Sequence, residues 1–279
     1  NAAIEWLEKP RSGPFYLYLN LQQTHYAYRL PPGVAGRFGS STVNELQARG
    51  HEITYFRVDP DAQEAVRLAY DDALHFVDTQ IGRLHAALEA MGELDDTLLV
   101  ITADHGESFG EAGVDTHGKT LREPEARPPL LFYFPSKLPA RDVYEPISHL
   151  DVMPTVLDIL GLPSYPGHQG ATALGNAGSA RDARGVFLTM QGLRHADAVV
   201  CYPWKFVHDR SGRKVELYNL ERDPGERRNL AGSRSTIRTR LEAVLDAQIK
   251  AQLDYHAQNR MRSDERFAPR LASCPELPR

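Results

Sequence analysis

The stretch from Leu98 to Glu107 constrains this chain more than any other. An apolar run ends there abruptly in Asp104, His105 and Gly106. A continuous apolar run bounded by polar residues is typical of a buried strand in a parallel sheet. In open α/β sheets, ligands bind at the carboxyl ends of such strands. The stretch therefore predicts an α/β fold with a polar site at this strand end.

Asp104 and His105 offer two different metal donors at that point. A carboxylate oxygen and an imidazole nitrogen can bind the same divalent cation, and Gly106 lets the backbone approach a ligand closely. The simpler alternative is that both side chains only cap the turn after the strand. The pair alone leaves both interpretations open.

The composition is that of an ordinary folded protein. The chain has 279 residues, of which 42% are hydrophobic and 25% charged, so it can form one large α/β domain with a smaller appendage. A net charge of -5 gives no electrostatic surface for nucleic acid. Cys201 and Cys274 are too few for a disulfide framework and match no metal-binding spacing, which leaves the redox compartment open.

The first 163 residues alternate between predicted strands and helices. The clearest helix covers 61–91, because its apolar residues recur at spacings of three and four. A short turn then leads into the strand at 97–103, which is typical of a helix returning onto a parallel sheet. The other expected elements are strands at 15–21 and 129–134 and a helix at 148–160.

The composition changes after residue 163. Residues 164–184 are rich in Gly, Ala and Ser and predict a linker. A small antiparallel sheet with a terminal helix at 235–257 is expected within 185–258, and 259–279 is expected to be a poorly ordered tail. The predicted strands of this sheet cover 185–190, 198–202, 205–209 and 215–220.

Three further residues have side chains suited to an anionic substrate. His25 follows the first predicted strand, and His117 and Lys119 lie in the loop after His105. Imidazole titrates near neutral pH and can protonate a leaving oxygen, while an ammonium group can neutralise charge on an oxyanion. Taken singly, each is more often an ordinary polar or solvated residue.

Several segments, taken in order from about residue 14 to 231, resemble the sulfatase family of the alkaline-phosphatase superfamily. The Asp-His-Gly-Glu segment alone is also found in phosphoethanolamine and lipoteichoic-acid-type transferases. The segments that carry the resemblance are Phe15 to Tyr28, Tyr70 to Leu84, Thr102 to Glu111, His117-Gly-Lys119, Arg127-Pro-Pro-Leu-Leu131, His149-Leu-Asp-Val-Met-Pro-Thr to Leu162, and Glu216-Leu-Tyr-Asn-Leu-Glu-Arg-Asp-Pro-Gly-Glu to Leu230.

The resemblance implies a fold and a set of residue roles. The implied fold is alkaline-phosphatase-like, with a mainly parallel sheet between helices and a small C-terminal antiparallel sheet with a helix. Residues 1–163 would form the C-terminal part of the catalytic domain. Asp104 and His105 would be metal ligands, for Ca²⁺ in the first place and otherwise Mn²⁺ or Zn²⁺. Lys119 would contact the sulfate oxygens, and His25 and His117 the substrate anion or the leaving group.

The family's nucleophile is a formylglycine made from the Cys or Ser of a Cys/Ser-x-Pro-x-Arg motif. The resemblance places that motif upstream of Asn1, so this chain is expected to be a fragment without its nucleophile. The chain also departs from the family in Leu121-Arg-Glu-Pro-Glu125, where an aromatic residue followed by acids is usual, and in Tyr26-Ala27, where proline usually follows Thr-His.

The implied function is metal-dependent hydrolysis of sulfate esters, with a small-molecule, glycan or lipid sulfate ester as substrate and no nucleic-acid partner. One alternative is a phosphodiesterase or phosphoethanolamine-type transferase of the same superfamily. Another is a non-catalytic domain that binds an anion or a partner. An extracytoplasmic location is slightly favoured, and a membrane anchor could lie in the missing N-terminal part.

Overall fold

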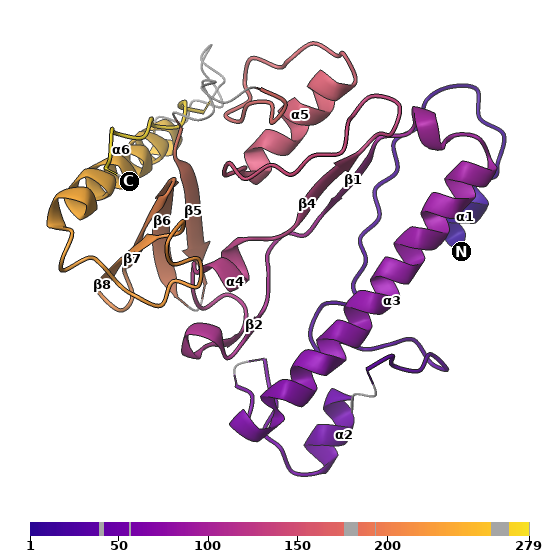
Figure 1. The fold of residues 1–279 in the computed structure, drawn as a ribbon, viewed down its shortest axis with the longest axis horizontal. Helices are drawn as coiled ribbons and strands as arrows, with labels where there is room; N and C mark the ends of the chain where they lie inside the picture. The colour runs from indigo at the N-terminus through magenta and orange to yellow at the C-terminus, as the bar shows by residue number, and fades with distance from the viewer. Residues whose placement is uncertain (39–41, 56, 176–183, 193, 258–267, 279) are drawn as a thin grey trace. The chain divides into compact units, whose positions relative to one another are not determined.

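The computed structural model describes residues 1–38, 42–55, 57–175, 184–192, 194–257 and 268–278 (Figure 1). The chain forms two units. The first contains Asn1–His117 and Arg127–Ala140, and the second contains Gly118–Ala126 and Arg141–Arg279. Within the described residues, no helix is both long and apolar enough to cross a membrane.

The first unit is built along one long helix, α3 (Gln63–Ala90), which the 3-10 turn η1 (Pro60–Ala62) precedes. This confirms the helix predicted at 61–91. Two apolar clusters pack against α3, one at each half of the helix. The N-terminal half packs with Tyr28, Val43, Leu46, Ile53 and Val58, and the C-terminal half packs with Leu7, Phe15, Leu17, Leu94 and Leu99.

Two short helices and a second 3-10 turn complete these clusters. Helix α1 (Ala2–Leu7) supplies Leu7, and η2 (Leu94–Asp96) supplies Leu94. Helix α2 (Val43–Ala48) begins in a reciprocal cap, in which the Thr42 hydroxyl accepts the Glu45 N–H and the Glu45 carboxylate accepts the Thr42 N–H. Such a cap satisfies two donors that a helix start leaves unpaired.

Strand β1 (Leu99–Thr102) pairs with β4 (Leu130–Tyr133), and the pairing is antiparallel, with Leu99 opposite Tyr133. Both strands were predicted, but the parallel neighbour expected for 97–103 is not found among the described residues. The residues of β1 alternate between half-buried and exposed instead of being buried throughout, and an apolar run by itself leaves the direction of the neighbouring strand open.

The strand predicted at 15–21 forms no strand ladder within the described part of the chain. Phe15 and Leu17 nevertheless pack against the Leu7 cluster, whereas Tyr16 and Tyr18 are 83% and 72% exposed. Successive side chains therefore alternate between core and solvent as in a strand.

The second unit contains the expected antiparallel sheet. Its strands are β5 (Val186–Gln191), β6 (His195–Cys201), β7 (Trp204–Asp209) and β8 (Lys214–Asn219), in that spatial order. Helix α6 (Ser235–Ala257) contacts β6 and β7 (Figure 1). Its residues Ile237, Leu241 and Leu245 share one core with Val199, Phe206 and Leu217 of the sheet, so the predicted sheet and helix are both confirmed.

The helix predicted at 148–160 is also present, as the 3-10 turn η4 (His149–Asp151) followed by α5 (Val152–Ile159). Asp151 between them is fully buried. Its carboxylate accepts the Ser148 and Ala171 N–H groups and pairs with Arg184 at 2.7 Å. A buried carboxylate needs such donors, so Asp151 ties this helix to the start of the sheet.

The C-terminal segment is not the loose tail that the sequence suggested. Cys274 forms a disulfide with Cys201 at the end of β6, and the Trp204 indole N–H donates to the Pro278 carbonyl oxygen at 2.6 Å. Ser273 also forms an antiparallel bridge with Arg184. Residues 258–267 of the expected tail and 176–183 of the expected linker lie outside the described residues.

A buried ion cluster joins residues 118–126 to the sheet of the same unit. Lys205 of β7 is fully buried, and its Nζ lies 2.8 Å from Glu123 Oε1 and 2.9 Å from Glu226 Oε1. Glu123 begins the short helix α4 (Glu123–Ala126), and its N–H donates to Glu226 Oε2. Burial raises the pKa of Glu226, and Lys205 partly offsets that rise. The charged form of Glu226 therefore depends on Lys205.

We predict that Lys205→Met lowers the free energy of unfolding by about 3–5 kcal/mol, because it leaves the buried Glu226 and the half-buried Glu123 without their cation. Urea unfolding of the full-length protein followed by circular dichroism measures the loss. Lys214→Met, at the exposed start of β8, is the matched control. A Lys205→Met variant as stable as this control would show that the ion cluster is not needed for stability.

Candidate functional site

Asp104 and His105 follow β1 directly, as predicted, and a ligand can reach both side chains from solvent. The Asp104 side chain is 90% exposed and that of His105 is 42% exposed, with 3.8 Å between Oδ2 and Nε2. His105 Nδ1 lies 2.8 Å from the Gly106 carbonyl oxygen and so donates to it. Its Nε2 is then the nitrogen with a lone pair available to a metal.

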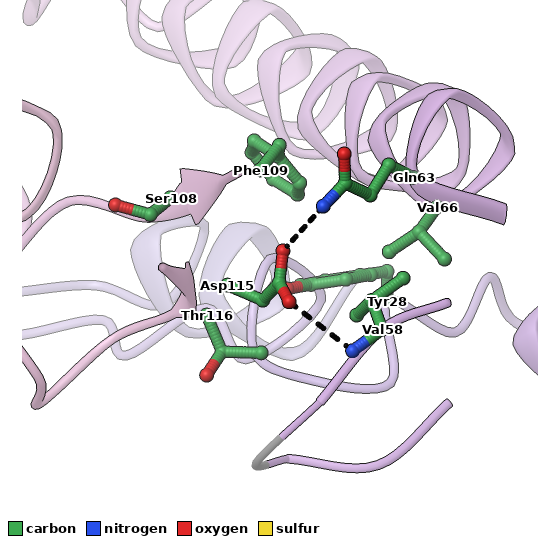
Figure 2. A pocket seen from close by; sticks show the side chains of 8 residues that line it. All are labelled: Tyr28, Val58, Gln63, Val66, Ser108, Phe109, Asp115 and Thr116. Carbon is green, nitrogen blue, oxygen red and sulfur yellow. Dashed lines mark hydrogen bonds between the residues drawn. The ribbon is translucent and has the colours of Figure 1, made fainter. Parts of the chain in front are cut away.

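The loop after His105 forms a small hairpin of β2 (Ser108–Phe109) and β3 (Asp115–Thr116), with the 3-10 turn η3 (Glu111–Gly113) between the strands. Figure 2 shows how it is held: the Asp115 carboxylate accepts the Val58 N–H at 3.2 Å and the Gln63 side-chain N–H at 2.9 Å. The pocket there is about 10 Å³ and has room for little more than one water. The two hydrogen bonds of Asp115 therefore hold the hairpin in place. The pocket beside them has no room for a substrate.

His117 comes directly after β3, and its backbone is fixed by Thr116 and Tyr55. Thr116 has a φ of 64° and is 2% exposed, and its hydroxyl donates to the Tyr55 carbonyl oxygen at 2.7 Å. The Tyr55 hydroxyl donates to the His117 carbonyl oxygen at 3.4 Å, and the two rings lie 5.1 Å apart. The hairpin thus sets where the His117 ring lies.

Glu107 sets the orientation of the His117 ring. Its side chain is 6% exposed, and Oε1 lies 3.1 Å from His117 Nδ1. Oε2 accepts the Tyr28 hydroxyl at 3.0 Å. Burial and the nearby Glu107 carboxylate raise the pKa of Tyr28, so its hydroxyl stays protonated as a donor. Because the carboxylate accepts, His117 Nδ1 carries the proton, and Nε2 is the ring nitrogen that Glu107 does not engage.

The first unit brings three histidines together. The ring centres of His105 and His117 are 4.1 Å apart, and those of His25 and His117 are 6.2 Å apart. His25 Nδ1 lies 2.7 Å from the Tyr26 carbonyl oxygen, so Nδ1 donates there too. Three imidazole rings therefore gather near the end of β1.

The metal donors in the first unit form only part of a ligand set. The described residues contain no group of three His, Cys, Asp or Glu side chains arranged to hold a metal. A carboxylate and an imidazole suit Ca²⁺, Mn²⁺ and Zn²⁺ to different degrees, but each of these ions takes at least four ligands. The two residues fit the chemistry of a divalent site as a partial donor set.

Lys119 belongs to the second unit and is half-buried. The N–H groups of Lys119 and Thr120 donate to the buried Glu125 carboxylate at 3.1 and 3.3 Å. Arg122 pairs with Glu216 of β8 at 3.1 Å. The segment that differs from the family pattern, Leu121 to Glu125, therefore fixes the backbone that carries Lys119.

Glu107, Tyr28 and Glu125 were not predicted as site residues from the sequence. An acid two residues after a candidate metal ligand was the available signal for Glu107. Nothing local marks Tyr28, because it meets Glu107 across 79 residues of chain. Glu125 was noted only as a departure from the family pattern.

Comparisons with known proteins agree with the resemblance. A family model described as Sulfatase matches residues 1–162. The chain is 24% identical over 263 residues to a sulfatase of Formosa agariphila, a match that covers 88% of this chain and 51% of that protein. It is 27% identical over 279 residues to arylsulfatase A of Homo sapiens, a match that covers 86% of this chain and 49% of that protein. The chain thus spans about half the length of these relatives.

Solved structures give the same fold. One is the protein BT4656, solved in complex with its substrate D-glucosamine-2-N,6-O-disulfate. It is similar at a TM-score of 0.62 and 23% identity, and the match covers 80% of this chain and 47% of that chain. Another is a phosphonate monoester hydrolase of Agrobacterium radiobacter, similar at a TM-score of 0.53 and 26% identity. That match covers 70% of this chain and 42% of the hydrolase. The predicted alkaline-phosphatase-like fold class is confirmed.

We predict that Glu107→Ala releases the His117 ring. The substitution leaves the Tyr28 hydroxyl and His117 Nδ1 without their acceptor, so stability falls by about 1–3 kcal/mol. The ¹⁵N NMR signals of His117 should also change from one tautomer to a mixture. Glu89→Ala, on an exposed position of α3, is the control. A single unchanged tautomer in Glu107→Ala would contradict this role for Glu107.

Proposed function

The chain belongs to the sulfatase family, and from this premise we propose that it is part of an enzyme that hydrolyses sulfate esters of small molecules or glycans. The observation that carries the proposal is the grouping of His25, His105 and His117 at the end of β1, with His117 oriented by the buried Glu107. Relatives named arylsulfatase A and choline-sulfatase support this reaction class.

In this proposal His25 and His117 handle the proton of the leaving group. Nδ1 of His25 is engaged by a carbonyl oxygen and Nδ1 of His117 by Glu107, so each ring presents Nε2 to the substrate. An imidazolium at that atom can protonate the ester oxygen as the bond to sulfur breaks. Glu107 fixes the orientation of the His117 ring and thereby supports this role.

Lys119 is proposed to bind the sulfate oxygens. Its ammonium group would neutralise negative charge that develops on the sulfuryl group in the transition state. Glu125 and the Lys205 cluster act on Lys119 through its backbone, because they fix the loop from which the side chain extends.

Asp104 and His105 are proposed as two ligands of a divalent metal, with Ca²⁺ as the first candidate and Mn²⁺ or Zn²⁺ as alternatives. When bound, such an ion would supply Lewis-acid stabilisation of the substrate's oxygens. The exposed Asp104 Oδ2 and the available His105 Nε2 are the atoms that would hold it.

We assign the nucleophile, a formylglycine, to a residue outside 1–279. The Cys/Ser-x-Pro-x-Arg pattern does not occur in this sequence. The nearest approach is Cys201-Tyr-Pro-Trp-Lys205, in which lysine replaces arginine and the cysteine is held in a disulfide. The same disulfide favours an oxidising, extracytoplasmic compartment.

A second candidate reaction is hydrolysis of a phosphonate or phosphate ester, favoured by the structural similarity to a phosphonate monoester hydrolase. Tetrahedral sulfuryl and phosphoryl groups offer similar oxygen acceptors to a lysine or a histidine side chain. Parallel assays of the full-length protein on 4-nitrophenyl sulfate and 4-nitrophenyl phenylphosphonate separate the two reactions. Turnover of neither ester would favour a non-catalytic anion-binding role.

We predict that Lys119→Ala lowers kcat/KM for 4-nitrophenyl sulfate by about 100- to 1,000-fold, the usual effect of removing one oxyanion donor. Lys214→Ala, an exposed lysine of the same unit, should leave the rate unchanged. An unaltered rate in Lys119→Ala would remove Lys119 from the reaction.

We also predict that Asp104→Asn and His105→Ala each weaken metal binding by at least about tenfold. Isothermal titration of chelator-treated full-length protein with Ca²⁺, Mn²⁺ and Zn²⁺ measures the change. Asp95→Asn, at an exposed position of η2, serves as the control. Equal affinity in all of these variants would mean that Asp104 and His105 only cap the turn after β1.

A further inference from the structure

The second unit contains a pocket that none of the proposed reaction roles uses. Residues near the ends of β7 and β8 and in the segment between β8 and α6 form its walls, and its volume is about 340 Å³, within the range of small-ligand sites. Its lining consists of Trp204, Asn219, Arg222, Asp223, Arg228, Leu230, Ser233 and Arg234.

The charge of this pocket is strongly positive. Arg222, Arg228 and Arg234 line it, and within the described part of the chain none of their guanidinium groups forms an ion pair. The single lining carboxylate, Asp223, accepts the backbone N–H groups of Arg227 at 3.1 Å and Arg228 at 2.8 Å. The pocket therefore has three cationic side chains and one acid whose oxygens are already engaged.

Three other arginines of the same unit form ion pairs with carboxylates. Arg122 pairs with Glu216, Arg184 with Asp151, and Arg210 with Asp197. The three pocket arginines have no carboxylate partner among the described residues, as is also true of the exposed Arg213 and Arg227. What sets the three apart is that they line the same pocket.

Two further features of the pocket also favour an acceptor ligand. Asn219 is 3% exposed, and its Oδ1 accepts the Arg222 N–H at 3.0 Å, which fixes the orientation of the amide. Its Nδ2 is then a buried donor that finds no acceptor among the described residues. Ser233 and Arg234 lie immediately before α6, so the pocket adjoins the N-terminal end of a 23-residue helix, where anions are favoured.

We propose that this pocket binds a tetrahedral oxyanion, a sulfate or phosphate group that is either free or esterified. Guanidinium groups bind such groups through paired N–H donors. The ligand contacts are assigned to Arg222, Arg228 and Arg234, with Asn219 in the wall. This inference is independent of the proposed reaction, because none of these residues has a role in it.

Trp204 offers a direct reporter, because it lines the pocket and is 4% exposed. The full-length protein is labelled with 5-fluorotryptophan, and the ¹⁹F resonance that disappears in Trp204→Phe is assigned to Trp204. This signal is followed during titration with sodium sulfate, sodium phosphate, glucose 6-sulfate and glucose 6-phosphate. Sodium chloride at matched ionic strength is the blank, and the four ligands separate free ions from esters.

We expect a saturable shift with at least one of the four ligands and a non-saturating response to chloride. Arg228→Gln should weaken the apparent affinity by at least about tenfold. Arg227→Gln is the matched control, because Arg227 is exposed and adjacent in sequence but does not line the pocket. Lys119→Ala should retain saturation, so this result is separable from that of the proposed reaction.

Two results would overturn the proposal. One is a shift that never saturates and follows ionic strength alone. The other is an equal loss of affinity in Arg227→Gln and Arg228→Gln, which would indicate general attraction to a basic surface instead of a site.

Discussion

The second unit depends on a lysine that has no access to water. Lys205 is a residue of β7, and two glutamates from different segments, Glu123 and Glu226, neutralise its charge. A charged Glu226 is costly to bury without the cation, and a charged Lys205 is costly to bury without a carboxylate. The three residues therefore have to assemble together, which joins α4 and the 220–230 segment to the sheet as one structure.

Buried carboxylates perform a similar task in both units. Glu107 holds the ring of His117 in the first unit, and Glu125 holds the backbone of Lys119 in the second. In each case an acid removed from solvent fixes a group that we propose to meet the substrate. Candidate reactive groups are thus positioned by partners that do not themselves face the substrate, which is a common way to preorganise a site.

Elements with a strong local pattern were predictable from the sequence. The repeat of apolar residues placed α3 and α6, and the strands of the C-terminal sheet followed from short apolar runs separated by turns. Partners distant in sequence were not predictable. The antiparallel pairing of β1 and the contact of Tyr28 with Glu107 both depend on where remote segments meet. The grouping of His25 with His117 was expected from strand order and is present.

The C-terminal residues carry a consequence for anyone who shortens this chain. Residues 268–278 are tied to the sheet by the disulfide to Cys201, by the Trp204 indole and by the bridge to Arg184. Truncation after α6 would leave Cys201 as an unpaired thiol beside an uncovered apolar surface that Leu277 now packs against. The final segment is therefore part of the core of this unit, and a shortened protein would gain a site for oxidation and self-association.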